Sequence, residues 1–330
     1  MSMRSCIKLI EKYKRFLITS HTNMEGDAIG SELAFAFLLR RLGKTPLIVN
    51  EDDIPYGYDF LPGTRAVTRY NRSAGRISFD CFVALDCSDL HRTGEVYRLN
   101  DVNKPVLNID HHVSNGYFGT VNWVDPHACC ACELVWRLYK KLRIPISRDA
   151  ALALYAGVVT DTGSFRYANT TSQTHVIAAE LVATGIDVAA VYRNIYASIP
   201  YEDLKLLASI LPTMRRSDDG RIVWFEVSKE ILKKQKKIFF DLSENILNFG
   251  RSLKGAEVVI LFKENVASRG EVRVNFRSHG LVDVNAVARE FGGGGHRTAS
   301  GATVTGTLPG IRRLVLASVR KAFNACRPRS

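Results

Sequence analysis

The sequence predicts an α/β protein with two parts: a doubly wound, mainly parallel sheet in the N-terminal part, and a smaller α/β domain with a central sheet in the C-terminal part. Two observations lead to this prediction. Short apolar, β-branched runs alternate with a helix-period segment in the first 110 residues, and a second block of such runs begins after residue 220. The chain has 330 residues, which is enough for two domains that each bury a core.

Four short runs in the N-terminal part have the composition of strands: RFLITS (15–20), TPLIVN (45–50), CFVALD (81–86) and PVLNID (105–110). Between the first two, SELAFAFLLRRLGK (31–44) has apolar residues at helical spacing, and Gly43 follows its last turn as a stop signal. A repeated order of strand, helix and strand predicts parallel pairing.

The rest of the chain divides into a helical region and a second block of strands. Helices are predicted at 131–142, 147–160, 172–185 and 187–196, and a further helix within 201–214. Strands are predicted at 221–228, 256–264 and 271–278, followed by a helix at 283–291 and the glycine-rich stretch FGGGGHRTASG (291–301). We therefore predict domains at 1–196 and 217–330, joined by a linker at 197–216.

Composition limits the classes of protein to be considered. Hydrophobic residues make up 46% and charged residues 24% of the chain, as in ordinary soluble proteins. No apolar run approaches 18 residues and the N-terminus lacks the apolar stretch of a secretion signal, so we expect a cytoplasmic protein without a membrane partner. The net charge of +12 favours an anionic partner without identifying it, because basic runs at 233–237 and 327–330 contribute much of the excess.

Three of the seven cysteines, Cys129, Cys130 and Cys132, lie together in ACCACE. A structural zinc site would need a second pair of ligands at a suitable spacing, and none is evident. We therefore expect small buried thiols in a reducing compartment.

Acidic and imidazole side chains follow several of the predicted strands. His21 comes directly after the first strand, Asp86 ends the third, and Asp110, His111 and His112 end the fourth. Ligands of open α/β sheets bind at the carboxyl ends of the strands, so these residues are expected at one edge. Glu25 and Asp27 follow His21 in HTNMEGDAIGS (21–31), and Asp161 lies where the helix at 147–160 ends.

Each of these residues alone has a structural explanation, such as a helix cap or a satisfied polar group. Together, the four carboxylates of Glu25, Asp27, Asp86 and Asp161 would repel one another unless cations neutralised them. Oxygen and imidazole ligands without thiolate suit Mn²⁺, or alternatively Mg²⁺, better than structural zinc. Two such ions are a common device for splitting phosphate esters.

The sequence also resembles a known family. NIDHHVSNGYFGTVNWVD (108–125) resembles the signature of the DHH phosphoesterase superfamily, and HTNMEGDAIGS (21–31), VALDCSD (83–89) and TDTGSFRYANTT (160–171) resemble its other motifs. FGGGGHRTASG resembles the glycine-rich motif of the associated DHHA1 domain. In length and motif wording the chain is most similar to the bacterial nanoRNases, which are bifunctional oligoribonucleases and phosphatases of 3′-phosphoadenosine 5′-phosphate (pAp). The resemblance implies a DHH catalytic domain at 1–196 and a DHHA1 substrate-binding domain at 217–330.

The resemblance also implies roles for single residues. One divalent metal would be held by His21, Glu25 and Asp86. The second would be held by Asp27, Asp86, His111 and Asp161, so that Asp86 bridges the two ions. His112 would face the leaving group or phosphate, and Asp110 would orient an imidazole. The implied reaction is in-line attack on phosphorus by a metal-bridging hydroxide.

The C-terminal domain is expected to capture a phosphate. Four consecutive glycines, 292–295, let backbone amides approach an anion closely, although a flexible loop is the alternative explanation for glycines alone. A nearby histidine and an Arg–Ser pair can add charge-assisted contacts. With the resemblance, the predicted substrate-binding residues are Arg277, Ser278, Gly293, Gly294, Gly295 and His296.

The first motif departs from the family at two positions. Glu25 stands where the family commonly has Asp, and Met24 where it commonly has Pro. The additional methylene of Glu25 adds roughly 1.5 Å of reach and keeps the charge, so we expect two-metal binding with an altered affinity at the His21 site. The cysteines of ACCACE replace small hydroxyl residues of similar size, which predicts little beyond sensitivity to oxidation.

The predicted function is Mn²⁺-dependent hydrolysis of very short RNA oligonucleotides to nucleoside monophosphates, with hydrolysis of pAp to AMP as a second activity. One alternative is a phosphodiesterase that acts on cyclic dinucleotides or their linear products. Another is a non-catalytic nucleotide- or RNA-binding protein with a degenerate metal site. The sequence leaves homodimerisation open.

Overall fold

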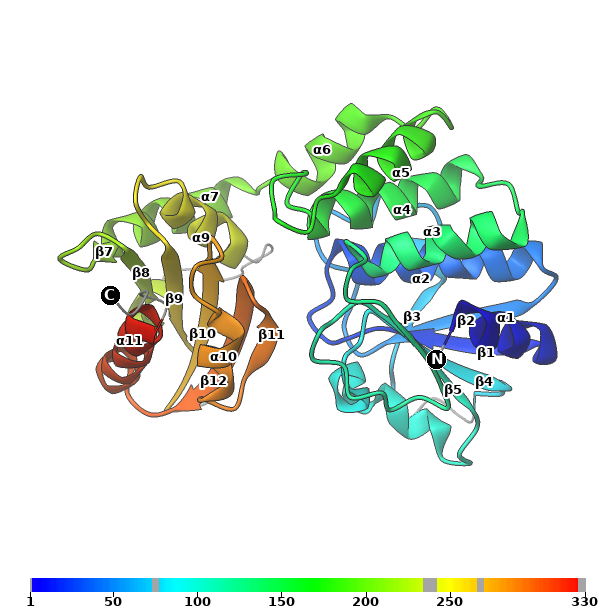
Figure 1. The fold of residues 1–330 in the computed structure, drawn as a ribbon, viewed down its shortest axis with the longest axis horizontal. Helices are drawn as coiled ribbons and strands as arrows, with labels where there is room; N and C mark the ends of the chain where they lie inside the picture. Colours follow the sequence, from blue (N-terminus) through cyan, green and yellow to red (C-terminus); the bar gives the residue numbers. More distant parts are fainter. Residues whose placement is uncertain (1, 73–76, 234–241, 266–269, 326–330) are drawn as a thin grey trace. The chain divides into compact units, whose positions relative to one another are not determined.

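The structure is a computed structural model that describes residues 2–72, 77–233, 242–265 and 270–325. The basic residues at 234–237 and 327–330 that contribute to the net charge lie outside the described residues. The chain forms two compact units, Met1–Ser198 and Ile199–Ser330 (Figure 1). Each unit has its own sheet and its own apolar core.

The first unit is built on a six-stranded sheet with the order β3-β2-β1-β4-β5-β6, in which every neighbouring pair is parallel. Its strands are β1 (Arg15–Thr19), β2 (Thr45–Asn50), β3 (Val67–Arg69), β4 (Cys81–Leu85), β5 (Val106–Asp110) and β6 (Val121–Val124). The four predicted strands and the parallel pairing are confirmed, each strand to within one residue at either end. The short edge strands β3 and β6 were not predicted.

The order of the strands creates a switch point between β1 and β4. From β1 the chain moves outward to β2 and β3, and it then returns to add β4, β5 and β6 on the other side. The loops that leave the two central strands consequently diverge at the carboxyl ends of these strands, which is where α/β sheets of this type bind ligands. The predicted doubly wound topology is confirmed.

Helices cover one face of this sheet: α2 and α3 contact its strands, and α4 packs on α2 and α3 (Figure 1). The helices of the unit are α1 (Met3–Lys12), α2 (Gly26–Arg41), α3 (Ala131–Leu142), α4 (Arg148–Asp161), α5 (Ser172–Val182) and α6 (Val188–Tyr196). Apolar residues of the 3-10 segment η2 (Leu90–Asn100) pack against the opposite face, and η1 (Thr64–Ala66) is a single turn.

Helix α2 begins five residues earlier than the apolar pattern predicted. Glu25 occupies the N-cap position, and its carbonyl accepts the amide of Ile29 at 3.1 Å. The polar residues between 25 and 31 therefore form the first helical turn rather than a loop, which places Asp27 on a rigid element.

The second unit has a mixed six-stranded sheet with the order β11-β12-β10-β9-β8-β7, in which only β8 and β9 among the described strands pair in parallel. Its strands are β7 (Arg215–Arg216), β8 (Ile222–Val227), β9 (Val258–Glu264), β10 (Glu271–Ser278), β11 (Gly294–His296) and β12 (Ala299–Thr305). The predicted strands at 221–228, 256–264 and 271–278 are confirmed as β8, β9 and β10.

Helices lie on both faces of the second sheet. Apolar residues of α10 (Val284–Arg289) and α11 (Leu308–Ala325) form one core with the sheet, and those of α7 (Tyr201–Ile210), α8 (Lys229–Lys233) and α9 (Ser243–Arg251) form another. A 3-10 turn, η3 (Leu211–Thr213), follows α7, which lies within the interval 197–216 predicted to join the domains. Helix α11 was not predicted, and α10 is shorter than the predicted 283–291.

None of the helices in the described parts of the chain combines the length and the apolar character needed to cross a lipid bilayer.

A candidate metal centre at the carboxyl ends of the parallel strands

Three neighbouring strands deliver the predicted histidines and aspartates to one edge of the first sheet. His21 lies two residues beyond β1, Asp86 directly follows β4, and His111 directly follows β5. Because β1, β4 and β5 are adjacent and parallel, their carboxyl ends lie together at the switch point.

Asp86 is the centre of the cluster. Its side chain is 3% exposed, with Oδ2 3.4 Å from His21 Nε2 and Oδ1 3.3 Å from His111 Nε2. Its backbone has a φ of 52°, in the left-handed region that residues other than glycine seldom adopt. This backbone conformation turns the chain out of β4 and places one carboxylate between two imidazoles.

Asp27 and Asp161 approach the same histidine from two helices. Asp27 Oδ2, from the first turn of α2, and Asp161 Oδ2, from the last residue of α4, each lie 3.8 Å from His111 Nε2. Asp27 also accepts backbone amides of the first turn of α3, from Ala131 at 2.6 Å and Cys132 at 2.9 Å. Three helices therefore fix these carboxylates before any cation binds.

Several carboxylates are buried close together in this cluster, and their burial and mutual repulsion shift their pKa values. Burial, with Asp86 adding to it, raises the pKa of Asp27 to about 6, and burial raises the pKa of Asp161 well above its usual value. Burial acts in the same direction on Asp86, but His111 and His21 outweigh it and hold the pKa of Asp86 well below its usual value.

The pKa of His111 shows the same excess of negative charge. Burial on its own would lower this pKa, yet the surrounding aspartates, with Asp161 first, raise it well above the ordinary imidazole value. A cation bound among these carboxylates would neutralise the negative charge that now favours protonation of His111.

Glu25 lies near two members of the cluster, His21 and Asp161. It is exposed, unlike Asp27 two residues later, and its charge contributes to raising the pKa values of His21 and Asp161. The preceding loop is held by backbone contacts, because the amide of Thr22 donates to the carbonyl of Arg92 at 2.7 Å. The structure thus places Glu25 beside the cluster, and its coordination of the His21 metal stays a prediction.

His112 and Asp110 form a separate pair next to Asp86. His112 Nδ1 lies 2.7 Å from Asp110 Oδ1, and Asn115 Nδ2 donates to Asp110 Oδ2 at 2.6 Å. Asp110 is fully buried, and each of its two carboxylate oxygens accepts one of these hydrogen bonds. The hydrogen bond to Asp110 fixes the orientation of the His112 ring.

The donor set fits a divalent cation. Asp27, Asp86 and His111 each offer a ligand atom, these atoms lie within 4.8 Å of one another, and all three residues are buried. Asp86 Oδ1 is buried, and although His111 Nε2 lies 3.3 Å from it, it accepts no well-aligned hydrogen bond from the described residues. A buried carboxylate oxygen without a donor is costly, and carboxylate and imidazole ligands suit Mn²⁺ or Mg²⁺.

The predicted substrate-binding residues lie at one edge of the second sheet. Arg277 and His296 are both paired in register with Ala299, so their side chains lie on the same face, two strand spacings or roughly 10 Å apart. Arg277 contacts Glu244 of α9. The hydroxyl of Ser278 is buried and donates to the carbonyl of Val282 at 2.8 Å, which fixes the turn after β10.

The glycines of the motif at 292–295 differ in what they require. A Cβ at Gly293 would lie 2.2 Å from the carbonyl oxygen of Gly301, and one at Gly295, whose φ is 138°, would lie 2.5 Å from that of Ala299. At Gly294 a Cβ would meet no atom within 4 Å. Gly293 and Gly295 are therefore required for the close approach of β12, in addition to the predicted contact of the motif with an anion.

Comparison with known proteins places this site in a family. Residues 15–158 match the DHH family, N-terminal domain, and residues 229–325 match the DHHA1 domain. A Thermus thermophilus protein named bifunctional oligoribonuclease and PAP phosphatase NrnA is 30% identical over 92% of this chain and 89% of its own length. The chain belongs to the DHH family.

Further relatives agree with this assignment. The Bacillus subtilis protein of the same name is 27% identical, with 90% of this chain and 92% of the relative covered. The crystal structure of an exopolyphosphatase-related protein from Bacteroides fragilis superimposes with a TM-score of 0.88 at 26% identity, covering 98% of this chain and 97% of that chain. The predicted resemblance, the DHH and DHHA1 fold and the hydrolase class are confirmed.

Sequence reasoning missed a buried polar network beside this DHH-family site. Glu32 is fully buried on α2, and its Oε2 accepts from Asn50 Nδ2 at 2.8 Å, while Asn50 Oδ1 accepts from the amide of Ser20 at 3.3 Å. Burial, partly offset by the Asn50 hydrogen bond, raises the pKa of Glu32 to about 7. The sequence feature that could have indicated this network is the single acidic residue in the apolar run SELAFAF. Such a residue could equally lie on the solvent-facing side of a helix.

Proposed function

We propose that the protein is a Mn²⁺-dependent phosphoesterase that hydrolyses very short RNA oligonucleotides to nucleoside monophosphates and, as a second activity, pAp to AMP. The observation that carries this proposal is the position of Asp86, a buried carboxylate with one imidazole at each oxygen. The names of the Thermus and Bacillus relatives supply the substrate class, because both are described as oligoribonucleases and PAP phosphatases.

The proposed ligand sets are those that the family resemblance implies. His21, Glu25 and Asp86 would hold one ion, and Asp27, Asp86, His111 and Asp161 would hold the second. Two divalent ions in this place would stabilise negative charge on the phosphoryl oxygens. The distances that support this division are those from Asp86 to His21 and His111, 3.4 and 3.3 Å.

The residues of the chain orient and protonate the substrate in this proposal. Asp110 Oδ1 accepts a hydrogen bond from His112 Nδ1, so His112 would contact the leaving oxygen through Nε2 as an acid or hydrogen-bond donor. Arg277 and His296, on one face of the second sheet, would bind a terminal phosphate together with the backbone of the glycine motif.

The test is hydrolysis of three substrates by the purified protein with Mn²⁺: a 5′-labelled RNA dinucleotide, pAp and a cyclic dinucleotide. We expect nucleoside monophosphates from the dinucleotide and AMP from pAp. Turnover of the cyclic dinucleotide alone would replace the proposal with a cyclic-dinucleotide phosphodiesterase. Binding of dinucleotide and pAp without any product would replace it with a non-catalytic binding protein.

A matched pair of variants ties the activity to the site. Asp86→Asn should reduce turnover of the dinucleotide by at least about a thousandfold, because it removes the carboxylate shared by both proposed ions. Asp53→Asn removes a carboxylate that is exposed and paired with Arg69, and it should leave turnover unchanged. Equal activities of the two variants would overturn the assignment of Asp86.

A further inference from the structure

The positive charge of the chain is concentrated in its second unit. This unit contains 23 of the 45 Lys and Arg residues but only 13 of the 33 Asp and Glu residues, so it carries ten of the twelve net charges. Helix α11 is the clearest example, since it contains Arg312, Arg313, Arg320 and Lys321 and no acidic residue. The proposed hydrolysis makes no use of these residues.

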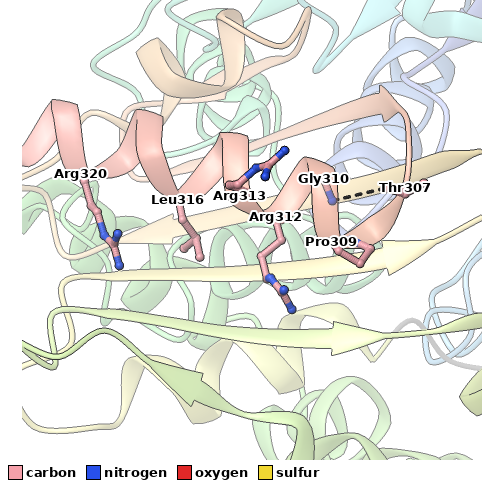
Figure 2. A pocket seen from close by; sticks show the side chains of 7 residues that line it. All are labelled: Thr307, Pro309, Gly310, Arg312, Arg313, Leu316 and Arg320. Atoms are coloured by element: carbon pink, nitrogen blue, oxygen red, sulfur yellow. Dashed lines mark hydrogen bonds between the residues drawn. The ribbon is translucent and has the colours of Figure 1, made fainter.

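The three arginines line a pocket along α11. Its volume is about 540 Å³, within the range of about 300 to 1,000 Å³ that is typical of ligand sites. Figure 2 shows Arg312, Leu316 and Arg320 extending from the same side of the helix. Their spacing of four residues places neighbouring side chains roughly 6 Å apart along the axis, with the apolar Leu316 between two guanidinium groups.

The charge of the pocket is largely uncompensated. Arg312 Nη1 lies 2.7 Å from Glu226 Oε1, whereas Arg313 and Arg320 are exposed and have no acidic partner in the part of the chain that the structure describes. The positive field comes from these guanidinium groups rather than from the helix end. Thr307 already caps that end, because its Oγ1 accepts the amide of Gly310 at 3.3 Å and its carbonyl that of Ile311 at 2.9 Å.

The pocket is separate from the predicted phosphate-binding residues. Phe276 packs in the core shared with α11, so Arg277, the next residue along β10, points to the opposite face of the sheet. His296 shares the face of Arg277, since both pair with Ala299. The arginines of α11 therefore do not belong to the same subsite.

We propose that this pocket, the α11 pocket, binds the phosphodiester backbone of single-stranded RNA. Arg313 and Arg320 are seven residues apart, so their backbone positions lie two turns apart on one face of α11, and each side chain would contact a phosphate. Leu316, between them along the helix axis, would lie against the ribose or base. Single-stranded RNA alternates anionic phosphates with less polar riboses and bases. It therefore complements a face of α11 on which an apolar side chain lies between two cations. This surface would bind RNA longer than a dinucleotide, and its existence does not depend on the proposed function.

The experiment is fluorescence anisotropy with a 5′-labelled 12-nucleotide single-stranded RNA, in EDTA so that no turnover occurs, at 50 to 300 mM salt. Arg313→Ala/Arg320→Ala should bind this RNA on the order of tenfold more weakly than the wild type at 100 mM salt. The slope of log affinity against log salt should become shallower by about 1.4, since each phosphate contact of a single strand contributes about 0.7. Arg312 is left in place because it is paired with Glu226.

The control is Arg4→Ala/Lys8→Ala, which removes the same charge from two exposed positions of α1. It should bind the RNA like the wild type, and both double variants should unfold at the wild-type urea midpoint because all four side chains are exposed. Unchanged binding by the pocket variant would overturn the proposal, and so would equal weakening in both variants, which would indicate a general charge effect.

A second probe separates RNA from an acidic protein partner. A labelled peptide of twelve glutamates should bind the wild type more weakly than the RNA does, and the pocket variant should not change its affinity. Tighter binding of the peptide, lost in the pocket variant, would assign the pocket to an acidic protein segment instead. Hydrolysis of pAp by the pocket variant should equal that of the wild type, because the α11 pocket and Arg277 lie on opposite faces of the sheet.

Discussion

Replacement of Glu32 by Gln should make the metal-free protein more stable at neutral and alkaline pH. Glu32 is fully buried, its Oε2 accepts one hydrogen bond from Asn50, and its Oε1 has no hydrogen-bond partner among the described residues. Burial raises its pKa from the ordinary 4.5 to about 7. Ionisation of Glu32 therefore destabilises the folded state relative to the unfolded state.

The sign and the size of the effect follow from linkage. Between pH 4.5 and about 7 the folded state binds more protons at Glu32 than the unfolded state, so the free energy of unfolding falls as pH rises through this window. A difference of about 2.5 pKa units corresponds to roughly 3 kcal/mol above pH 7, of which about 2 to 3 kcal/mol develops between pH 5 and pH 8. Glu32→Gln removes this dependence, because the amide does not ionise.

Urea unfolding of wild type and Glu32→Gln at pH 5 and pH 8, in EDTA, measures the difference. The variant should gain about 2 to 3 kcal/mol relative to the wild type between the two pH values, whatever its stability at pH 5. Glu11→Gln, at an exposed position of α1, is the matched control and should show no such change. The same pH dependence in wild type and Glu32→Gln would refute the reasoning that Glu32 is held in its neutral form.

Three other predictions concern the two domains. Gly293→Ala should lower the free energy of unfolding by about 2 kcal/mol or more in urea titrations, because its Cβ would meet a carbonyl oxygen at 2.2 Å, whereas Gly294→Ala, with no atom within 4 Å, should cost well under 1 kcal/mol. Asn115→Ala removes a hydrogen bond to Asp110 and should lower kcat for pAp about tenfold with KM nearly unchanged; an altered KM at constant kcat would contradict its role in orienting the proposed catalytic pair, His112 and Asp110. Because the pKa of Asp27 is raised to about 6, protons should compete with Mn²⁺ below that pH, and calorimetry should show about tenfold weaker binding at pH 5 than at pH 7.5; equal affinities would show that Asp27 is not a ligand.

The parallel sheet and the residues at its edge could be predicted because both depend on local sequence. A buried parallel strand is a short apolar run, and the residue after it lies at the carboxyl edge whatever the rest of the fold does. His21, Asp86 and His111 could therefore be placed together from their positions alone. The edge strands β3 and β6 are too short, at three and four residues, to give a reliable pattern.

Contacts between distant segments could not be predicted in the same way. Asp27 accepts amides from residues more than 100 positions later, and no local pattern reports this contact. Glu32 has the spacing of a solvent-facing residue, and the packing of α2 against the sheet, where Asn50 at the end of β2 contacts Glu32, makes it buried. Helix α11 could have been recognised, since Ile311, Val315 and Val319 recur every four residues and are all buried.

The most direct test of the proposed dinuclear centre is a calorimetric titration of Mn²⁺ into the metal-free protein at pH 7.5. The proposed ligand sets predict two ions per chain for the wild type. They also predict that Asp86→Asn weakens the binding of both ions by at least about a hundredfold, while Asp53→Asn still binds two with wild-type affinity. A single ion in the wild type, or two ions bound with unchanged affinity by Asp86→Asn, would contradict the account.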